Sequence, residues 1–176
     1  GKVKLNLIAS VDYKNASHFI QKDTVGLTMN ISGSLNSLMI DEFKIKSSSG
    51  IEIAADGYVN NLENISETYY ELLLRTSPIT QHQLQGWLSI INPDVQLPAF
   101  SPASVSGKVS NTLKNPSFNL IVNSGSGRIG LNGNYNLNTN YAKLDATVLD
   151  LKLKEMLGED YPTNICCSLS WDGIAG

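Results

Sequence analysis

The chain has 176 residues, enough for one ordinary domain or for a few units of a repeat array. Charged residues make up only 16% of it and the formal net charge is −3, so it lacks the basic surface that binding to a phosphate backbone requires, and nucleic acid is not expected as a partner. Its apolar runs are all shorter than the roughly 20 residues that a membrane-spanning helix needs.

Apolar and polar residues alternate in short blocks along nearly the whole chain. This period of two predicts half-buried β-strands, each with one apolar face. The clearest blocks are Val3-Leu5-Leu7, Leu27-Met29-Ile31, Phe43-Ile45, Ile51-Ile53-Ala55, Tyr70-Leu72-Leu74, Phe118-Leu120-Val122, Ile129-Leu131 and Leu144-Ala146-Val148. Turns rich in Ser, Gly or Asn at 47–50, 124–127 and 138–140 separate neighbouring blocks, as hairpin turns do. The sequence therefore predicts an all-β antiparallel fold.

Two stretches have helical spacing instead. Apolar residues recur at this spacing over 78–91, behind Ser77 as an N-cap and Pro78 at the first helical position, and Pro93 ends the run. A second, shorter helix is expected at 151–157, before a glycine. The expected fold is thus all-β with two short helices.

Strands and turns recur at a spacing of roughly 75 residues, which indicates an internal repeat. Ile31-Ser32-Gly33 corresponds to Val105-Ser106-Gly107, and a third copy begins near Cys166-Cys167. The predicted units are the end of a preceding repeat (1–23), one full repeat (24–95), a second (96–160) and the start of a truncated third (161–176). Cys166 and Cys167 are neighbours on a predicted strand and point to opposite faces, so free thiols are expected.

Residues that would carry enzyme chemistry are not evident. The stretch from Gly125 to Gly130 fits a dinucleotide-binding pattern with Asp150 about 20 residues further on, but it continues as an alternating strand where that pattern needs a helix, so we interpret it as a hairpin turn. His18 and His82 lie far apart and have no acidic or thiol neighbours at metal-ligand spacing. We therefore expect no catalytic residues, no metal site, no cofactor and no enzymatic activity.

The repeat unit combines an apolar-Ser-Gly opening strand, a strand leading into a Gly/Ser turn, a strand ending near Gly, and a strand that runs into a short helix. In this it resembles the AsmA-like repeats of the TamB family over roughly 24–176, chiefly at 97–107, 125–136 and 149–160, and least over 11–23. The resemblance implies an open, curved antiparallel sheet, the β-taco, with an apolar inner face. It also implies a periplasmic location, with the full-length protein anchored to the inner membrane.

By the same resemblance, the chain is a segment of an envelope protein that shields or conducts phospholipid between the inner and outer membranes, or assists outer-membrane assembly. Its expected partners are phospholipid acyl chains and, through parts of the protein outside this chain, outer-membrane assembly proteins. The candidate residues for a lipid groove are Phe43, Ile45, Ile51, Ile53, Leu72, Leu74, Phe118, Leu120, Val122, Ile129, Leu131, Leu144 and Val148.

Two alternatives stay open at this point. The chain could be an extracellular or periplasmic β-sandwich that binds glycan or protein, a class that Asn-rich turns and low charge also suit. The inward face of an open sheet could also be filled by side chains instead of lipid, because half-buried strands alternate in either case.

Overall fold

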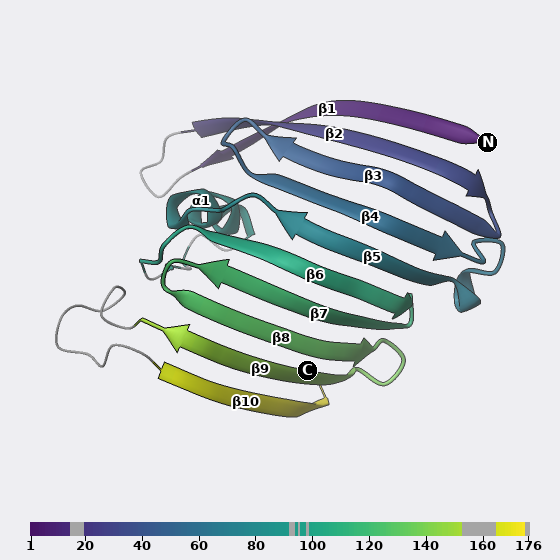
Figure 1. The fold of residues 1–176 in the computed structure, drawn as a ribbon. Coiled ribbons are helices and arrows are strands. Elements are labelled where there is room, and N and C mark those ends of the chain that lie inside the picture. Colours follow the sequence, from purple (N-terminus) through teal and green to yellow (C-terminus); the bar gives the residue numbers. More distant parts are fainter. Residues whose placement is uncertain (15–19, 92–93, 95, 98, 153–164, 175–176) are drawn as a thin grey trace.

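The computed structural model describes residues 1–14, 20–91, 94, 96–97, 99–152 and 165–174 (Figure 1). Within these ranges ten strands form one antiparallel sheet, in which the spatial order of the strands is their order in the sequence. β1 and β10 are the two edges, so the sheet is open. The all-β antiparallel architecture expected from the alternation is confirmed, and so is the open sheet that the resemblance implied. The two-sheet sandwich is not what the described strands form.

The strands are 8 to 15 residues long. They are β1 (Lys2–Lys14), β2 (Ile20–Ser34), β3 (Ser37–Ser47), β4 (Glu52–Asn60), β5 (Tyr69–Thr76), β6 (Ala103–Thr112), β7 (Asn115–Ser124), β8 (Gly127–Asn136), β9 (Tyr141–Leu151) and β10 (Ile165–Ile174). A 3-10 turn, η1 (Ile65–Glu67), precedes β5, and the helix α1 (Gln81–Ile91) lies between β5 and β6 in the sequence. Tight turns join most neighbours, including the predicted ones at 47–50, 124–127 and 138–140.

The helix starts three residues later than the sequence predicted. Ser77 and Pro78 lie before it: the Ser77 hydroxyl accepts a hydrogen bond from the backbone N–H of Glu52, at 2.9 Å. Thr80 caps the helix instead, because its hydroxyl accepts from the N–H of Gln83 at 3.3 Å while the Gln83 side chain accepts from the N–H of Thr80 at 2.8 Å. This reciprocal pair is a capping box. The contacts of Ser77 with another strand, which outcompete local helix capping, explain the later start.

The second predicted helix, at 151–157, falls mostly outside the described residues. Its first position, Leu151, is the last residue of β9, and the described chain resumes at β10. The stretch from Gly125 to Gly130 forms the hairpin between β7 and β8, as its turn chemistry predicted. Cys166 and Cys167 are both free and exposed.

The Ser-Gly motif shared by β2 and β6 has a backbone role. Gly33 and Gly107 have φ values of 112° and 149°, where a residue with a side chain is strained. A Cβ on Gly107 would lie 2.1 Å from the carbonyl oxygen of Asn119 in the next strand, and one on Gly33 would lie 2.2 Å from that of Ser37. In both strands only glycine lets the neighbouring backbone approach this closely.

Candidate functional site

The candidate site is one face of the sheet, and the pairing register defines it. Residues directly opposite each other in an antiparallel pair point to the same face, so a row can be followed from strand to strand. One such row, the middle row, takes a residue from every strand. Its members are Leu5, Met29, Phe43, Ala55, Leu74, Gly107, Leu120, Leu131, Ala146 and Leu169. Every one of them is apolar or glycine.

Two flanking rows on the same face are also apolar, apart from Thr76 in the second of them. The far row also crosses all ten strands and consists of Val3, Ile31, Ile40, Gly57, Leu72, Val109, Phe118, Gly133, Leu144 and Trp171. The near row lies toward α1 and comprises Leu7, Leu27, Ile45, Ile53, Thr76, Val105, Val122, Ile129, Val148 and Cys167. We refer to the three rows together as the apolar face.

The structure brings twelve of the thirteen predicted groove residues onto this face: Phe43, Ile45, Ile53, Leu72, Leu74, Phe118, Leu120, Val122, Ile129, Leu131, Leu144 and Val148. Ile51 is the exception. It lies in the turn before β4, where its backbone N–H donates to the Ser47 hydroxyl at 3.2 Å, and only 2% of it is exposed. Ile51 therefore offers almost no surface to a ligand.

Most of the apolar face has no second layer against it in the part of the chain that the structure describes. The buried apolar side chains found there are only Ile51, Ala54 and Ala55, and the strand residues of the apolar face are mainly half-buried. Exposure rises toward the two edges, where Leu5 is 43% and Leu169 67% exposed. A closed core would bury these side chains, so the apolar face is open to solvent.

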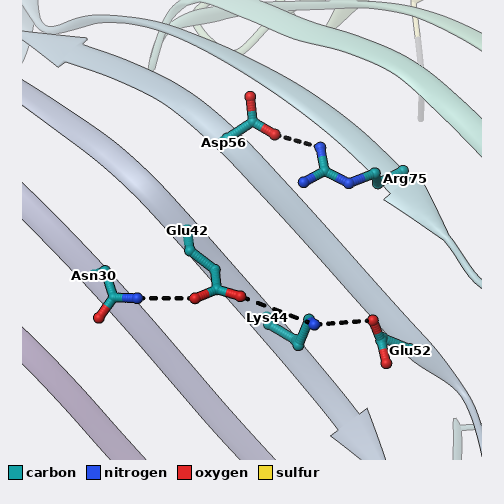
Figure 2. A network of polar contacts seen from close by, with 6 residues as sticks. All are labelled: Asn30, Glu42, Lys44, Glu52, Asp56 and Arg75. Atoms are coloured by element: carbon teal, nitrogen blue, oxygen red, sulfur yellow. Dashed lines mark hydrogen bonds and ion pairs between the residues drawn. The ribbon is translucent and has the colours of Figure 1, made fainter.

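The opposite face, which we call the polar face, carries the charged side chains of the central strands, although Leu73 and Ile121 also lie on it. Ion pairs join its strands (Figure 2). Lys44 on β3 contacts Glu52 on β4 at 3.2 Å and Glu42 at 3.9 Å, and Glu42 accepts a hydrogen bond from the Asn30 side chain on β2 at 2.8 Å. Arg75 on β5 pairs with an aspartate on β4 in the same way. Exposed pairs of this kind contribute at most about 1 kcal/mol each, so their main effect is to keep this face hydrated.

A second polar cluster lies further along the same face. Lys108 on β6 pairs with Glu71 on β5 at 3.0 Å, and the hydroxyl of Tyr58 donates to Glu71 at 3.4 Å. The hydrogen bond and charge of Glu71 raise the pKa of Lys108, and desolvation followed by the charge of Glu71 raises the pKa of Tyr58. Both shifts hold the groups in their usual protonation states at neutral pH. The sheet is therefore amphipathic, with charge on one side only of these central strands.

Sequence reasoning missed several members of the face. Leu5 and Met29 belong to recognised alternating blocks, and Leu169 lies in the expected third repeat, but one strand alone does not show which residues of its neighbours it aligns with. Val105 and Val109 flank the Ser-Gly motif of β6, whose alternation was visible in the sequence. A search for every period-two block next to a selected one would have found them.

Within the described ranges no group of three or more His, Cys, Asp or Glu side chains is placed to hold a metal ion. The helix found there is too short to cross a membrane. No family model, curated protein or solved structure compared with the chain matches it.

Proposed function

We propose that this chain is a non-catalytic segment of a cell-envelope protein that shields or conducts the acyl chains of phospholipid between the inner and outer membranes, or assists outer-membrane assembly. One observation carries the proposal: an apolar face whose middle row is apolar or glycine in all ten strands, and which the described part of the chain leaves mostly uncovered. Uncovered apolar surface of this extent marks an interaction site, because soluble proteins otherwise bury it.

The energetics favour a lipid tail as the occupant. Burying apolar surface contributes about 0.8 kcal/mol per methylene group, so a 16-carbon chain in water costs roughly 13 kcal/mol. Nine strand spacings of about 4.8 Å give a face on the order of 43 Å long, more than one acyl chain needs. A lipid could therefore move along the rows without leaving apolar contact.

The position of α1 supports a curved, trough-like sheet. The helix follows β5 in the sequence, yet it also comes close to β1, four strands away. In a flat sheet β1 would lie roughly 19 Å to the side of β5, so its approach to α1 is best explained by a sheet that bends toward the helix. The rows next to α1 would then line the concave side. We also propose that β2–β5 and β6–β9 are two successive AsmA-like repeats, since each is a four-stranded meander with the Ser-Gly motif in its first strand.

A periplasmic location follows from this proposal, with inner-membrane anchoring and contacts with outer-membrane assembly proteins supplied by other parts of the full-length protein. The polar face would meet the aqueous periplasm while the apolar face meets lipid. No cofactor or reaction is part of the proposed role, because moving a lipid along a surface breaks no bond.

Crosslinking in cells tests this role with a matched pair of positions. A photo-reactive phenylalanine analogue is placed in the full-length protein either at Leu120, in the middle row, or at Asn119, its neighbour on the opposite face. Irradiation should give phospholipid adducts at Leu120 and few or none at Asn119. Equal labelling at both positions, or no lipid at Leu120, would overturn the proposal.

A further inference from the structure

A cavity of about 420 Å³ lies between α1 and the sheet, at one end of the apolar face. Its roof is formed by Leu84 of α1 with Ile79 and Phe100 from the segments on either side of the helix. Its floor includes Val105, Val122 and Ile129 of the near row. The volume falls within the range of about 300–1,000 Å³ that is typical of small-molecule sites.

The hydroxyls of the two serines in the lining already have hydrogen-bond partners in the protein. The Ser124 hydroxyl accepts a hydrogen bond from the N–H of Ser126 at 2.9 Å, and the Ser126 hydroxyl lies 3.0 Å from that of Ser101. Ser126 is only 3% exposed. A water molecule needs two to four polar partners to be held, so a cavity with this lining favours an apolar occupant. Its lining also includes no charged side chain, which excludes a lipid head group from the interior.

The roof is held in place independently of any ligand. Ile79 pairs with Ala103 through two backbone hydrogen bonds of 2.8 and 2.9 Å. The Gln83 side chain donates to the backbone carbonyl of Ser49 at 2.6 Å, and the Gln85 side chain accepts from the N–H of Leu97 at 2.8 Å. Because these contacts fix the helix on the sheet, the cavity is preformed, and a ligand would not have to supply the free energy to open it.

The cavity is continuous with the apolar face. Val122 and Ile129 are paired across β7 and β8, and two positions further along the same strands lie Leu120 and Leu131 of the middle row. An occupant can therefore extend from the cavity onto the open rows without crossing polar surface. A compact apolar molecule would leave this path unused, whereas an unbranched chain follows it.

We propose that the cavity under α1 binds the methyl-terminal part of one unbranched acyl chain, with the rest of the lipid lying along the rows. If a methylene group takes about the 30 Å³ of a water molecule, the cavity holds roughly 14 of them. This inference rests on the proposed function, because it names the place on the lipid-bearing face where a tail ends. In this arrangement the acyl chain ends under α1, which closes the groove at this end.

The test uses the 176-residue chain and cis-parinaric acid, a linear fatty acid whose fluorescence rises in apolar sites. Ala103 lines the cavity, so Ala103→Trp should fill it; Asn132→Trp adds a tryptophan to the opposite face of the sheet, away from the cavity and from all three rows. We expect at least a tenfold loss of affinity for Ala103→Trp and less than a threefold change for Asn132→Trp. Both variants are checked for native circular dichroism.

The outcomes separate the two proposals. A wild-type chain that binds no parinaric acid would contradict the lipid-bearing role as well as the cavity. Normal binding by Ala103→Trp, or an equal loss in Asn132→Trp, would overturn the cavity alone. A diazirine-labelled fatty acid on the wild-type chain gives a readout that does not depend on the variants folding: adducts should map to Leu84 or Ile129, and adducts confined to the far row would overturn the inference.

Discussion

A positive charge in the middle row separates an open face from a closed core. Leu120 lies between Gly107 and Leu131, and it is half-buried. Full burial of a leucine side chain contributes about 1.5–3 kcal/mol, so replacing a half-buried one costs about 1 kcal/mol. In Leu120→Arg the long side chain can turn its guanidinium to water from an open face, so no buried unpaired charge is added to that cost.

The expected change in stability is therefore small. About 1 kcal/mol lowers the melting temperature by roughly 2–4 °C in a domain of this size. In a sealed core the same substitution would bury an unpaired charge and cost several kcal/mol, a large part of the 5–15 kcal/mol that stabilises a typical domain. Asn119→Arg, one position away on the polar face, is the matched control and should change stability by no more than about 0.5 kcal/mol.

Thermal melting of the chain is combined with outer-membrane permeability in cells that carry the full-length variant. Leu120→Arg should melt within a few degrees of the wild type and leave the outer membrane leaky, whereas Asn119→Arg should leave it intact. An unfolded Leu120→Arg chain would refute the open face, and a folded one with an intact outer membrane would refute the conduit. Ile129→Arg should cost more than Leu120→Arg, because Ile129 lies under α1.

Three further predictions concern the fold. Gly107→Ala should lower the free energy of unfolding by about 1–3 kcal/mol in urea titrations, because the φ of Gly107 is 149°. Gly130→Ala is the control and should be close to neutral, because its Cβ would meet its nearest neighbour at 3.9 Å. Equal effects of the two substitutions would contradict the strained backbone at Gly107. Thr80→Ala should cost about 1 kcal/mol and speed hydrogen exchange in α1, with Thr80→Ser retaining protection; unchanged exchange in Thr80→Ala would argue against the capping box. Burial raises the pKa of Tyr70, so its contribution to stability is complete below its ordinary pKa of about 10 and is lost as the pH rises through the higher folded value. Tyr70→Phe should therefore lose less stability than the wild type in alkaline denaturation, and an identical alkaline loss would refute this assignment.

The strands could be predicted from the sequence because alternation is a local property. A period of two fixes which residues of a strand share a face, and this placed Phe118, Leu120 and Val122 together correctly. The same rule failed for Ile51, which has the parity of Ile53 but lies in a turn that closes over it. Counting odd and even positions assigns a residue to a face of the sheet only within one continuous strand.

Long-range contacts explain the remaining differences. Ser77 resembles a helix cap, but in the fold its hydroxyl is engaged by a residue 25 positions earlier, and the Thr80–Gln83 capping box takes over its expected role. The cavity under α1 could not be predicted either, because Leu84 and Ile129 come together only when the segment carrying the helix returns over the sheet. The alternation within each strand shows which of its sides is apolar. The alignment of ten such sides into continuous rows depends on the pairing register between strands.

The central claim is that the apolar face carries lipid, and native mass spectrometry of the chain purified from bacterial cells tests it most directly. We expect a population with the added mass of one phospholipid, which is lost on unfolding and is reduced in Leu120→Arg but not in Asn119→Arg. A chain that carries no lipid, or lipid adducts that are the same in both variants, would contradict the account.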